Sequence, residues 1–435
     1  MSPRLPPDAS LPHPERFLAT DSCVQCGLCL PHCPTYLQSR QEPDSPRGRI
    51  SLIQALARGA IKADARVIEH LDGCLVCRAC EDMCPSRVPY ASLIDAVRSE
   101  LAGNTRPAGP QPLESRVLRQ FTRSRKLRRL VYAALRFWQD SGVDRWGTQF
   151  ADALPAGLGR LHSLMPKLQK TPLIDMDAQT GMDSSFDEDT DKPTVQLFTG
   201  CAGEVFDRAT LLSAHTVLMY LGYRVVVPEA QTCCGALPLH AGDETSAQAL
   251  AQTNLAAFTP TLPILSTASG CGATLKDMVS WHGNAAAPLA HATQDICSFL
   301  LTADWSGIAW PKTDLRVAVH TPCSLRRVLH ADSDVLALLA RIPGVNTYEI
   351  ARNDQCCGAA GRYMLDHPEM ADTLVADKVA DIARTAPDCV VSTNIGCSLH
   401  LQAALRRAGH EVEVVHPVTL IARLLPPLAT TNDVA

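Results

Sequence analysis

The sequence predicts an α+β protein of several domains, with an α-helical N-terminal domain followed by two α/β repeats that contain parallel sheets. Three observations predict this architecture: two cysteine runs joined by a helix-like insert, an acidic stretch of small residues near the middle, and a pattern of cysteines and strand-like runs that then occurs twice. The expected domains are residues 1–110 for the helical domain, 111–193 for a basic helical segment and an acidic linker, 194–310 for the first repeat and 311–430 for the second.

Composition indicates a globular chain that works in a reducing compartment. Its 435 residues are 46% hydrophobic, with a formal net charge of -5, which is enough apolar material for the cores of two or three domains. Residues 1–20 lack the apolar region of a secretory signal, and no stretch reaches the roughly 18 apolar residues of a membrane span. Because 18 cysteines occur without an export signal, we expect a cytoplasmic protein whose thiols serve metals or redox chemistry.

Two matching cysteine runs near the N-terminus predict two [4Fe-4S] clusters. They are Cys23-x2-Cys26-x2-Cys29-x3-Cys33-Pro34 and Cys74-x2-Cys77-x2-Cys80-x3-Cys84-Pro85. In such runs three thiolates bind one cluster, and the fourth, which precedes proline, completes the other. The first cluster is therefore assigned to Cys23, Cys26, Cys29 and Cys84, and the second to Cys74, Cys77, Cys80 and Cys33. The alternatives are less consistent, because zinc sites use paired C-x2-C arms and disulfides are disfavoured in a reducing compartment.

A helix-like insert separates the two runs. Apolar residues recur with helical spacing through residues 50–57, after a turn expected at residues 43–49. The stretch Ser45-Pro-Arg-Gly-Arg49 can cap this helix and present Arg47 and Arg49 near the anionic clusters, and a solvated turn is the alternative. The helical insert resembles the α-helical ferredoxin domain of respiratory dehydrogenase iron-sulfur subunits more than the β-rich bacterial ferredoxin.

Basic and acidic stretches follow the second run. From Arg116 to Arg136, arginine and lysine alternate with apolar residues, which fits one amphipathic basic helix. Such a helix could contact anionic lipid or an acidic partner, and packing on its own protein is the commoner explanation. Residues 178–193 are acidic, small and nearly free of aliphatic side chains, which predicts a linker and a domain boundary.

The remainder of the chain consists of one unit that occurs twice. The landmark cysteines of the two copies lie 122, 123 and 126 residues apart, which a duplication explains better than chance. In each copy, short β-branched runs alternate with helix-like stretches such as 209–221 and 368–382, a pattern typical of a parallel sheet covered by helices. The cysteines follow strand ends or precede helices, where open α/β sheets carry their functional groups.

Each copy has a single cysteine, an adjacent pair before glycine and a final cysteine. These residues are Cys201, Cys233, Cys234 and Cys271 in the first copy and Cys323, Cys356, Cys357 and Cys397 in the second. A glycine beside the adjacent pair lets the backbone turn sharply and aim both thiolates at one metal centre. The eight cysteines are therefore candidate ligands of a further iron-sulfur cluster, and buried structural thiols are the alternative.

The Cys-Cys-Gly motifs resemble those of the cysteine-rich (CCG) domain of heterodisulfide reductases. That family ends each motif in C-x2-C, whereas this sequence has Thr274 and His400 at the last position. The departure argues against the five-cysteine cluster of that family, and it makes His400 a candidate nitrogen ligand. His320, which precedes Thr-Pro-Cys323, could lie near a cluster. The residues expected to be structural are Cys297, Cys389, His215, His240 and His320.

Taken together, the motifs resemble those of the iron-sulfur subunit of glycolate oxidase, which is similar to the cluster-bearing subunit of anaerobic glycerol-3-phosphate dehydrogenase. The matching stretches are residues 21–36, 45–50, 267–273, 320–323, 356–358 and 394–397. The resemblance implies an oxidoreductase subunit without catalytic residues of its own. A flavoprotein partner that holds FAD would oxidise glycolate to glyoxylate, and this chain would carry the electrons singly to a quinone or other acceptor. The lack of a G-x-G-x-x-G motif is consistent with that division.

The sequence is also consistent with other functions. The partner could oxidise another hydroxyacid such as lactate, or glycerol-3-phosphate, because the substrate is chosen by the flavoprotein. The chain could instead be a thiol-disulfide reductase that acts at the Cys-Cys-Gly centres, or the repeats could be a docking scaffold without a cluster. We expect no nucleic-acid partner, and any membrane association is expected to be peripheral, on the inner face of the cell membrane.

Overall fold

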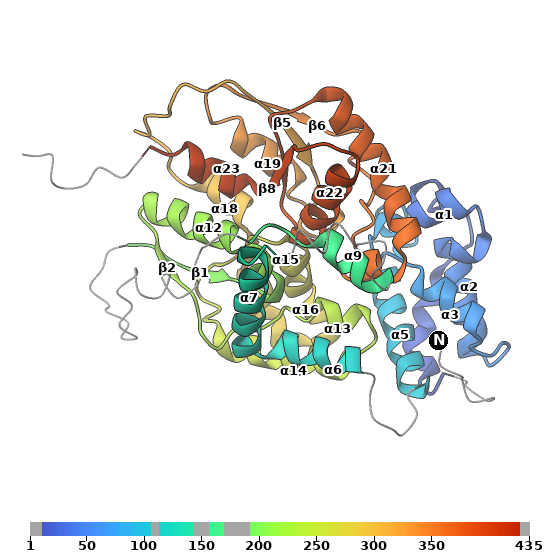
Figure 1. The fold of residues 1–435 in the computed structure, drawn as a ribbon. Coiled ribbons are helices and arrows are strands. Elements are labelled where there is room, and N and C mark those ends of the chain that lie inside the picture. The colour runs from blue at the N-terminus through green and yellow to red at the C-terminus, as the bar shows by residue number, and fades with distance from the viewer. Residues whose placement is uncertain (1–10, 106–112, 143–155, 169–191, 427–435) are drawn as a thin grey trace, which may run out of the picture.

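The chain folds into a helical N-terminal domain and two α/β repeats that pack against each other (Figure 1). This computed structural model describes residues 11–105, 113–142, 156–168 and 192–426. Most of the stretch expected as an acidic linker, residues 178–193, lies outside the described residues. The predicted α+β class is confirmed, with helices first and parallel sheets after them.

The N-terminal domain contains only helices and loops within its described residues. Its elements are η1 (Pro14–Ser22), η2 (Leu30–His32), α1 (Pro34–Ser39), η3 (Glu42–Asp44), α2 (Pro46–Ala57), α3 (Ala65–Asp72), α4 (Ala79–Asp82) and α5 (Tyr90–Thr105). Its core is built from apolar side chains with helical spacing, among them Ile53, Leu56 and Ile94, which are fully buried. The predicted helical insert between the cysteine runs is therefore confirmed.

Helix α2 begins earlier than the sequence indicated, because part of the expected turn is its first helical turn. Ser45 caps the helix by accepting the backbone N–H of Gly48 at 3.0 Å. Pro46 occupies the first helical position, where an N–H would have no helical partner. Gly48 lies very close to Glu42: a Cβ added to Gly48 would be 1.9 Å from the carbonyl oxygen of Glu42. The cap predicted for residues 45–49 is confirmed, with Ser45 as the capping residue, and the extent of the turn is corrected.

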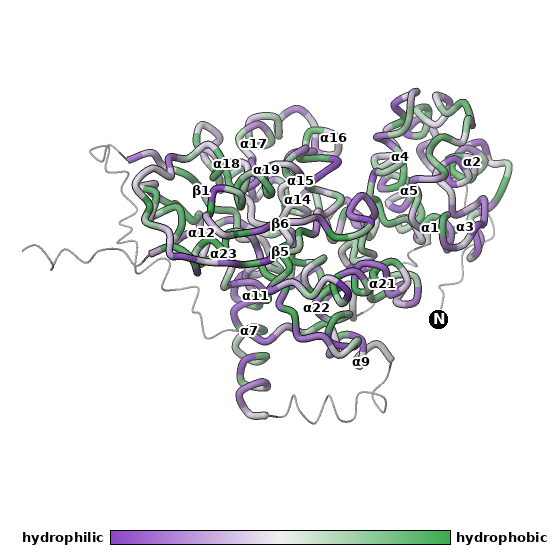
Figure 2. Tube along the Cα trace, turned by 90° about the horizontal axis from the view of Figure 1, so that it is seen from above, coloured by the Kyte–Doolittle hydropathy of each residue, from purple (hydrophilic) through white to green (hydrophobic). Residues whose placement is uncertain are grey.

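The basic segment forms two helices, not the single helix that the sequence predicted. Helix α6 (Leu113–Arg123) is separated from α7 (Arg125–Asp140) by Ser124, whose hydroxyl caps α7. On α7, Arg128 is 1% exposed and donates to the Glu204 carboxylate at 2.6 Å. This buried ion pair confirms that one face of the segment packs on its own protein. Figure 2 shows α7 projecting from the repeats, with hydrophilic and hydrophobic residues along it.

The first repeat is a parallel four-stranded sheet with strand order β2-β1-β3-β4. Its strands are β1 (Thr194–Phe198), β2 (Arg224–Val226), β3 (Ile264–Ser266) and β4 (Thr293–Asp295). The principal helices are α11 (Cys201–Phe206), α12 (Arg208–Tyr220), α13 (Ala236–His240), α14 (Glu244–Ala257), α15 (Ser269–Lys276), α16 (Met278–His282), α17 (Ala287–Ala292) and α18 (Ile296–Thr302). Each crossover carries a helix, as parallel strands require.

The second repeat has the same topology, with strand order β6-β5-β7-β8. Its strands are β5 (Leu315–His320), β6 (Val345–Glu349), β7 (Cys389–Ser392) and β8 (Glu413–Val415). The helices are η6 (Leu325–Leu329), α19 (Asp332–Leu339), α20 (Tyr363–Asp366), α21 (Pro368–Thr385), α22 (Ile395–Arg407) and α23 (Pro417–Leu424). The equivalent position of each strand in the two sheets confirms the predicted duplication with parallel sheets.

The two repeats share a hydrophobic core that includes strands of both sheets, for example Leu197 and Val319. Near the carboxyl ends of the strands they also meet through polar contacts. The Ser269 N–H donates to the Thr393 carbonyl at 2.8 Å, and the Ser269 and Ser324 hydroxyls lie 2.9 Å apart. The cysteine-bearing ends of the repeats therefore face each other.

The N-terminal domain contacts both repeats. Asp95 on α5 lies 2.9 Å from the His240 ring of the first repeat, and Arg327 of the second repeat pairs with Asp82. Helix α9 (Ala156–Leu164) lies against α22 of the second repeat. No helix in the described part of the chain is both long and apolar enough to cross a membrane.

Candidate iron-sulfur centres

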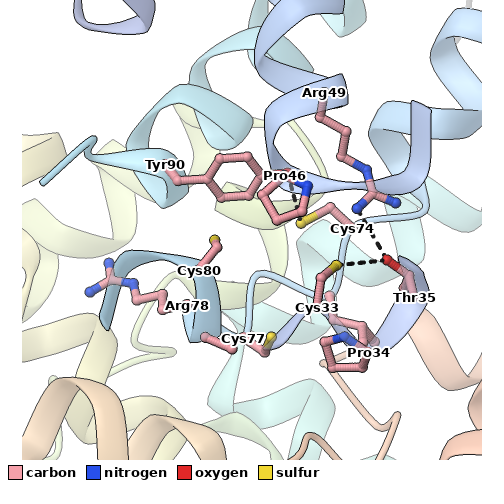
Figure 3. Close-up of a pocket in the computed structure, with 12 residues that line it drawn as sticks. Cys33, Pro34, Thr35, Pro46, Arg49, Cys74, Cys77, Arg78, Cys80 and Tyr90 are labelled. Atoms are coloured by element: carbon pink, nitrogen blue, oxygen red, sulfur yellow. Dashed lines mark hydrogen bonds between the residues drawn. The ribbon is translucent and has the colours of Figure 1, made fainter. Parts of the chain in front are cut away.

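The cysteines of the two N-terminal runs line two pockets, and the runs exchange their fourth members. One pocket is lined by Cys33, Cys74, Cys77 and Cys80 and has an empty volume of about 300 Å³ (Figure 3). The other is lined by Cys23, Cys26, Cys29 and Cys84, and also by Cys80 of the first pocket, with an empty volume of about 440 Å³. Each pocket is thus lined by three cysteines of one run and the fourth cysteine of the other run, and Cys80 lines both pockets. Such a donor set fits a [4Fe-4S] cluster.

The backbone of each cysteine run contains left-handed turns at equivalent positions. Residues two and four places after the first cysteine have positive φ: Gln25 (57°) and Gly27 (81°) in the first run, and Val76 (50°) and Arg78 (61°) in the second. A β-branched residue such as Val76 is strained in this region. Strained turns persist where the surrounding structure holds them, commonly at ligand sites. The repeated left-handed turns direct successive thiols toward one centre.

The two pockets differ in exposure. Cys26 in the first pocket is exposed, whereas Cys33, Cys74 and Cys80 in the second are buried. Burial raises the pKa of the Cys80 thiol well above its ordinary value, and the neighbouring Cys77 adds to the shift. Because metal ligands must be thiolates, the positive charge of iron has to stabilise the ligated form of these buried groups.

In the first repeat, four cysteines meet at the carboxyl end of the sheet. Cys201 begins α11 after β1, the adjacent pair precedes Gly235, and Cys271 lies in α15 after β3. The Cys201 and Cys233 sulfurs lie 3.3 Å apart. Hydrogen bonding to Cys233, together with burial, raises the pKa of Cys201 well above its ordinary value. The φ of 94° at Gly235 provides the sharp turn that the sequence predicted after the pair.

In the second repeat, a histidine joins the equivalent cysteines. The ligand atoms of His320, Cys357 and Cys397 all lie within 4.8 Å of one another, and all three residues are buried. The Nδ1 of His320 lies 3.0 Å from the Ser392 hydroxyl. Burial lowers the pKa of His320 well below its ordinary value, so the ring is neutral, which is the form that binds metals. The group can therefore supply sulfur and nitrogen ligands together.

The structure places His320, and not His400, beside these cysteines. His400 is fully buried, with Nε2 3.1 Å from the Ala371 carbonyl oxygen, and it is not part of the group of close ligand atoms found among the described residues. The sequence had favoured a structural role for His320. A comparison of the two repeats in the sequence distinguishes His320, because the equivalent position in the first copy is Phe198. The two copies therefore differ at the end of the first strand, where the second copy has a polar residue and the first copy has an apolar one.

The second repeat lies next to the buried N-terminal pocket. Leu75 shares a hydrophobic cluster with Cys356, Cys357 and Cys397, and Cys77 packs against that cluster. Cys323 contributes to the raised pKa of Cys77, after the larger effect of burial. In the described residues, the corresponding cluster of the first repeat contains Cys201, Cys233 and Cys234 but no cysteine of the N-terminal runs. The two repeats are therefore not equivalent with respect to the N-terminal domain.

Other cysteines and histidines occupy structural positions. Cys297 is fully buried at the start of α18, where its N–H donates to Asp295, and Cys389 lies buried in β7. His215 is buried in α12, while His240 faces the Asp95 carboxylate. These positions agree with the structural roles expected from sequence.

The fold and these centres define an iron-sulfur protein with a dicluster domain and duplicated cysteine-rich domains. Residues 19–88 match the family described as "4Fe-4S dicluster domain", and residues 195–276 and 317–402 match "Cysteine-rich domain". The predicted [4Fe-4S] clusters are thereby confirmed. Their assignment to individual cysteines stays a prediction.

Comparison over the full length identifies the family. The chain is 32% identical to the "Probable glycolate oxidase iron-sulfur subunit" of Bacillus subtilis (strain 168), covering 92% of this chain and 93% of that protein. It is also 32% identical to the "Glycolate oxidase iron-sulfur subunit" of Escherichia coli (strain K12), covering 92% and 95%. The chain belongs to the family of glycolate oxidase iron-sulfur subunits.

More distant relatives are oxidoreductase subunits and utilisation proteins. A subunit of the fumarate reductase (CoM/CoB) of Methanothermobacter marburgensis is 25% identical and covers 92% of this chain and 71% of that protein. "Lactate utilization protein A 2" of Bacillus cereus (strain 03BB102) is 25% identical and covers 53% of this chain and 98% of that protein. These matches support an oxidoreductase role for the chain.

Paired cysteine substitutions test the exchange of fourth ligands. We expect Cys26→Ser/Cys84→Ser to remove one cluster, or about four irons per chain, because both residues belong to one set. Cys77→Ser/Cys84→Ser should remove both clusters, or about eight irons. Iron analysis with EPR of the reduced protein measures the loss, with Cys389→Ser as the control that retains all iron. If each run used its own fourth cysteine, the two double variants would exchange their results.

A spectroscopic experiment tests His320 as a metal ligand. In protein labelled with nitrogen-15 histidine, we expect a nitrogen hyperfine coupling to a paramagnetic centre that disappears in His320→Phe, which introduces the residue of the first repeat. The same coupling should persist in His400→Phe, because His400 faces the Ala371 carbonyl. A coupling that survives in His320→Phe would contradict the assignment.

Proposed function

We propose that this chain is the electron-transfer subunit of a glycolate oxidase, which carries electrons from a flavoprotein that oxidises glycolate to glyoxylate toward a quinone or other acceptor. One observation supports this role most directly: Cys80 and Tyr90 line both N-terminal pockets, so the two cluster sites are adjacent. When bound, iron-sulfur clusters supply one-electron transfer. Adjacent sites suit the passage of single electrons from one to the next.

The exposed pocket is the proposed side on which electrons enter. Cys26 is exposed there, and the apolar side chains around it face solvent: Val24 is 69% exposed, Leu28 55% and Met83 42%. Exposed apolar groups gathered at one site are typical of protein interaction surfaces. We define Val24, Leu28 and Met83 as the docking patch and assign it to the flavoprotein, whose redox group must approach a cluster closely.

The buried pocket is the proposed exit from the N-terminal domain. Its loop residues Leu75 and Cys77 pack against the second-repeat cysteines, so the next redox centre would be in that repeat. Such a centre, held by Cys323, Cys356, Cys357, Cys397 and His320, is part of the proposal. The cysteines of the first repeat are candidate ligands of a separate cluster.

Flavin chemistry is assigned to the partner subunit, because the sequence has no dinucleotide-binding fingerprint. Membrane contact is proposed to be peripheral and on the inner face of the membrane. The exposed apolar side chains of Leu130 (65%) and Phe137 (77%) on α7, near the exposed Lys126, support this location.

A second candidate, a thiol-disulfide reductase, is favoured by the match to the fumarate reductase (CoM/CoB) subunit and by the close Cys201 and Cys233 sulfurs. Thr274 and His400 stand where the related CCG motifs have a further cysteine, which weighs against it. Disulfide reduction by the isolated chain with a chemical electron donor would support this candidate instead.

Substrate-dependent dye reduction tests the proposed function. The complex purified with its flavoprotein should reduce a dye with glycolate, and Cys26→Ser or Cys77→Ser should lower that rate at least tenfold because each removes one cluster. Cys389→Ser serves as the buried-cysteine control. Parallel assays with lactate and glycerol-3-phosphate identify the substrate. A faster rate with either compound would show that it, and not glycolate, is the substrate. Full activity in both cluster variants would refute electron transfer through this chain.

Charge substitutions in the docking patch test where the flavoprotein binds. Val24→Glu and Leu28→Glu should weaken co-purification with the flavoprotein at least tenfold, since each places a charge in an apolar interface. Leu130→Glu, an equally exposed site on α7, is the matched control and should leave the complex intact. EPR confirms that each variant retains its clusters. Loss of the complex only in Leu130→Glu would contradict the docking patch and indicate that the flavoprotein binds at α7.

A further inference from the structure

Arg49 places a buried positive charge beside the pocket of Cys33, Cys74, Cys77 and Cys80 (Figure 3). The side chain is 1% exposed. Its Nε donates to the His70 carbonyl at 2.6 Å, and its Nη1 donates to Thr35 Oγ1 at 3.1 Å. That hydroxyl lies 3.3 Å from the Cys33 sulfur and 3.2 Å from the Asp44 carbonyl oxygen, so it stands between the guanidinium and a proposed cluster ligand.

The third nitrogen of Arg49 has no hydrogen-bond partner among the described residues. Nη2 is buried, and it lies 3.4 Å from where a Cβ on Gly73 would be, next to Cys74. The nearest carboxylate oxygen, on Asp44, is 3.7 Å away, beyond hydrogen-bonding distance. That oxygen is also 2.8 Å from the His70 ring. The single carboxylate therefore neutralises the guanidinium incompletely.

The local environment keeps Arg49 charged. Burial alone would lower its pKa, but interactions with neighbouring groups, among them Tyr90, Cys74 and Cys33, outweigh this effect and raise the pKa above its ordinary value. Arginine is suited to this role because its guanidinium group is not deprotonated in proteins. The pocket thus contains a permanent positive charge with little solvent to screen it.

The arginine at the other pocket is arranged differently. Arg47 donates to both oxygens of Glu42, at 2.6 and 3.3 Å, and to the Gln25 carbonyl at 3.2 Å. The side chains of Arg47 and Glu42 are 30% and 48% exposed. Its charge is therefore paired with a carboxylate and screened by water, in contrast to that of Arg49.

We propose that Arg49 raises the reduction potential of the cluster at the buried pocket above that of the cluster at the exposed pocket, and so sets the direction of electron flow between them. The inference rests on the proposed ligand sets. Reduction adds one electron and one negative charge, which a nearby buried cation stabilises. One electron leaves the exposed site and one arrives at the buried site. Arg49 keeps its proton throughout, so no proton transfer accompanies the step.

A redox titration of the purified full-length chain, followed by EPR, tests this role. In the unmodified protein the buried-site cluster should be reduced at the higher potential. Arg49→Gln should lower its reduction equilibrium constant at least tenfold, or about 59 mV for a one-electron couple, while Arg49→Lys should lower it less. Arg47→Gln is the matched control and should leave the buried-site potential unchanged. An unchanged potential in Arg49→Gln, with both clusters present, would overturn the proposal.

Asp44→Asn provides an independent variant if Arg49 substitutions prevent folding or cluster assembly. It removes the only carboxylate near Nη2 in the described structure, so it should raise the buried-site potential, opposite in sign to Arg49→Gln. No change, or a fall, would overturn the proposal. The titration uses a chemical reductant and neither glycolate nor a flavoprotein, so its outcome is independent of the substrate proposed above.

Discussion

The exchange of Cys33 and Cys84 between the two cysteine runs is the constraint on which the N-terminal domain depends. Each pocket is lined by cysteines of both runs, so the insert has to return the chain to the place where it started. The buried helices α2 and α5 meet this requirement, and Tyr90 at the start of α5 lines both pockets. A helical insert with a closed apolar core thus brings two cluster sites together.

Electrostatics follows from the same geometry. Thiols such as Cys80 are buried where an uncompensated thiolate would be unstable, which is why burial raises their pKa. Bound iron would supply compensating positive charge, and Arg49 and Arg47 place further positive charge near the pockets in two contrasting ways. One arginine is buried with a partly unsatisfied guanidinium, and the other is exposed and paired with Glu42. Two sites with similar ligands therefore have different surroundings, which is a common means of separating reduction potentials.

The duplicated repeats show how one fold can take two roles. Both sheets have the same parallel order, and both place a cysteine pair before a left-handed glycine, Gly235 or Gly358. They differ at the end of the first strand of each sheet, where Phe198 in one copy corresponds to His320 in the other. They differ again in their neighbours, because only the second-repeat cysteine cluster packs against Cys77 in the described part of the chain. The copy with the additional histidine beside its cysteines is the one whose cysteine cluster packs against the N-terminal domain.

The sequence by itself determined the cysteine spacing, the duplication, the parallel repeats and the helical insert, because each is recorded in local periodicity or in a fixed offset. Spacing also predicted the exchanged fourth ligands, and residue types predicted a helix cap within residues 45–49. Only the tertiary structure decided that the basic segment breaks at Ser124 and buries Arg128 against Glu204, that His320 and not His400 joins the cysteines, and that Arg49 is enclosed while Arg47 is not. Those outcomes depend on which surfaces of the folded chain meet, and the residues involved are far apart in the sequence. The local spacing of residues does not encode such contacts.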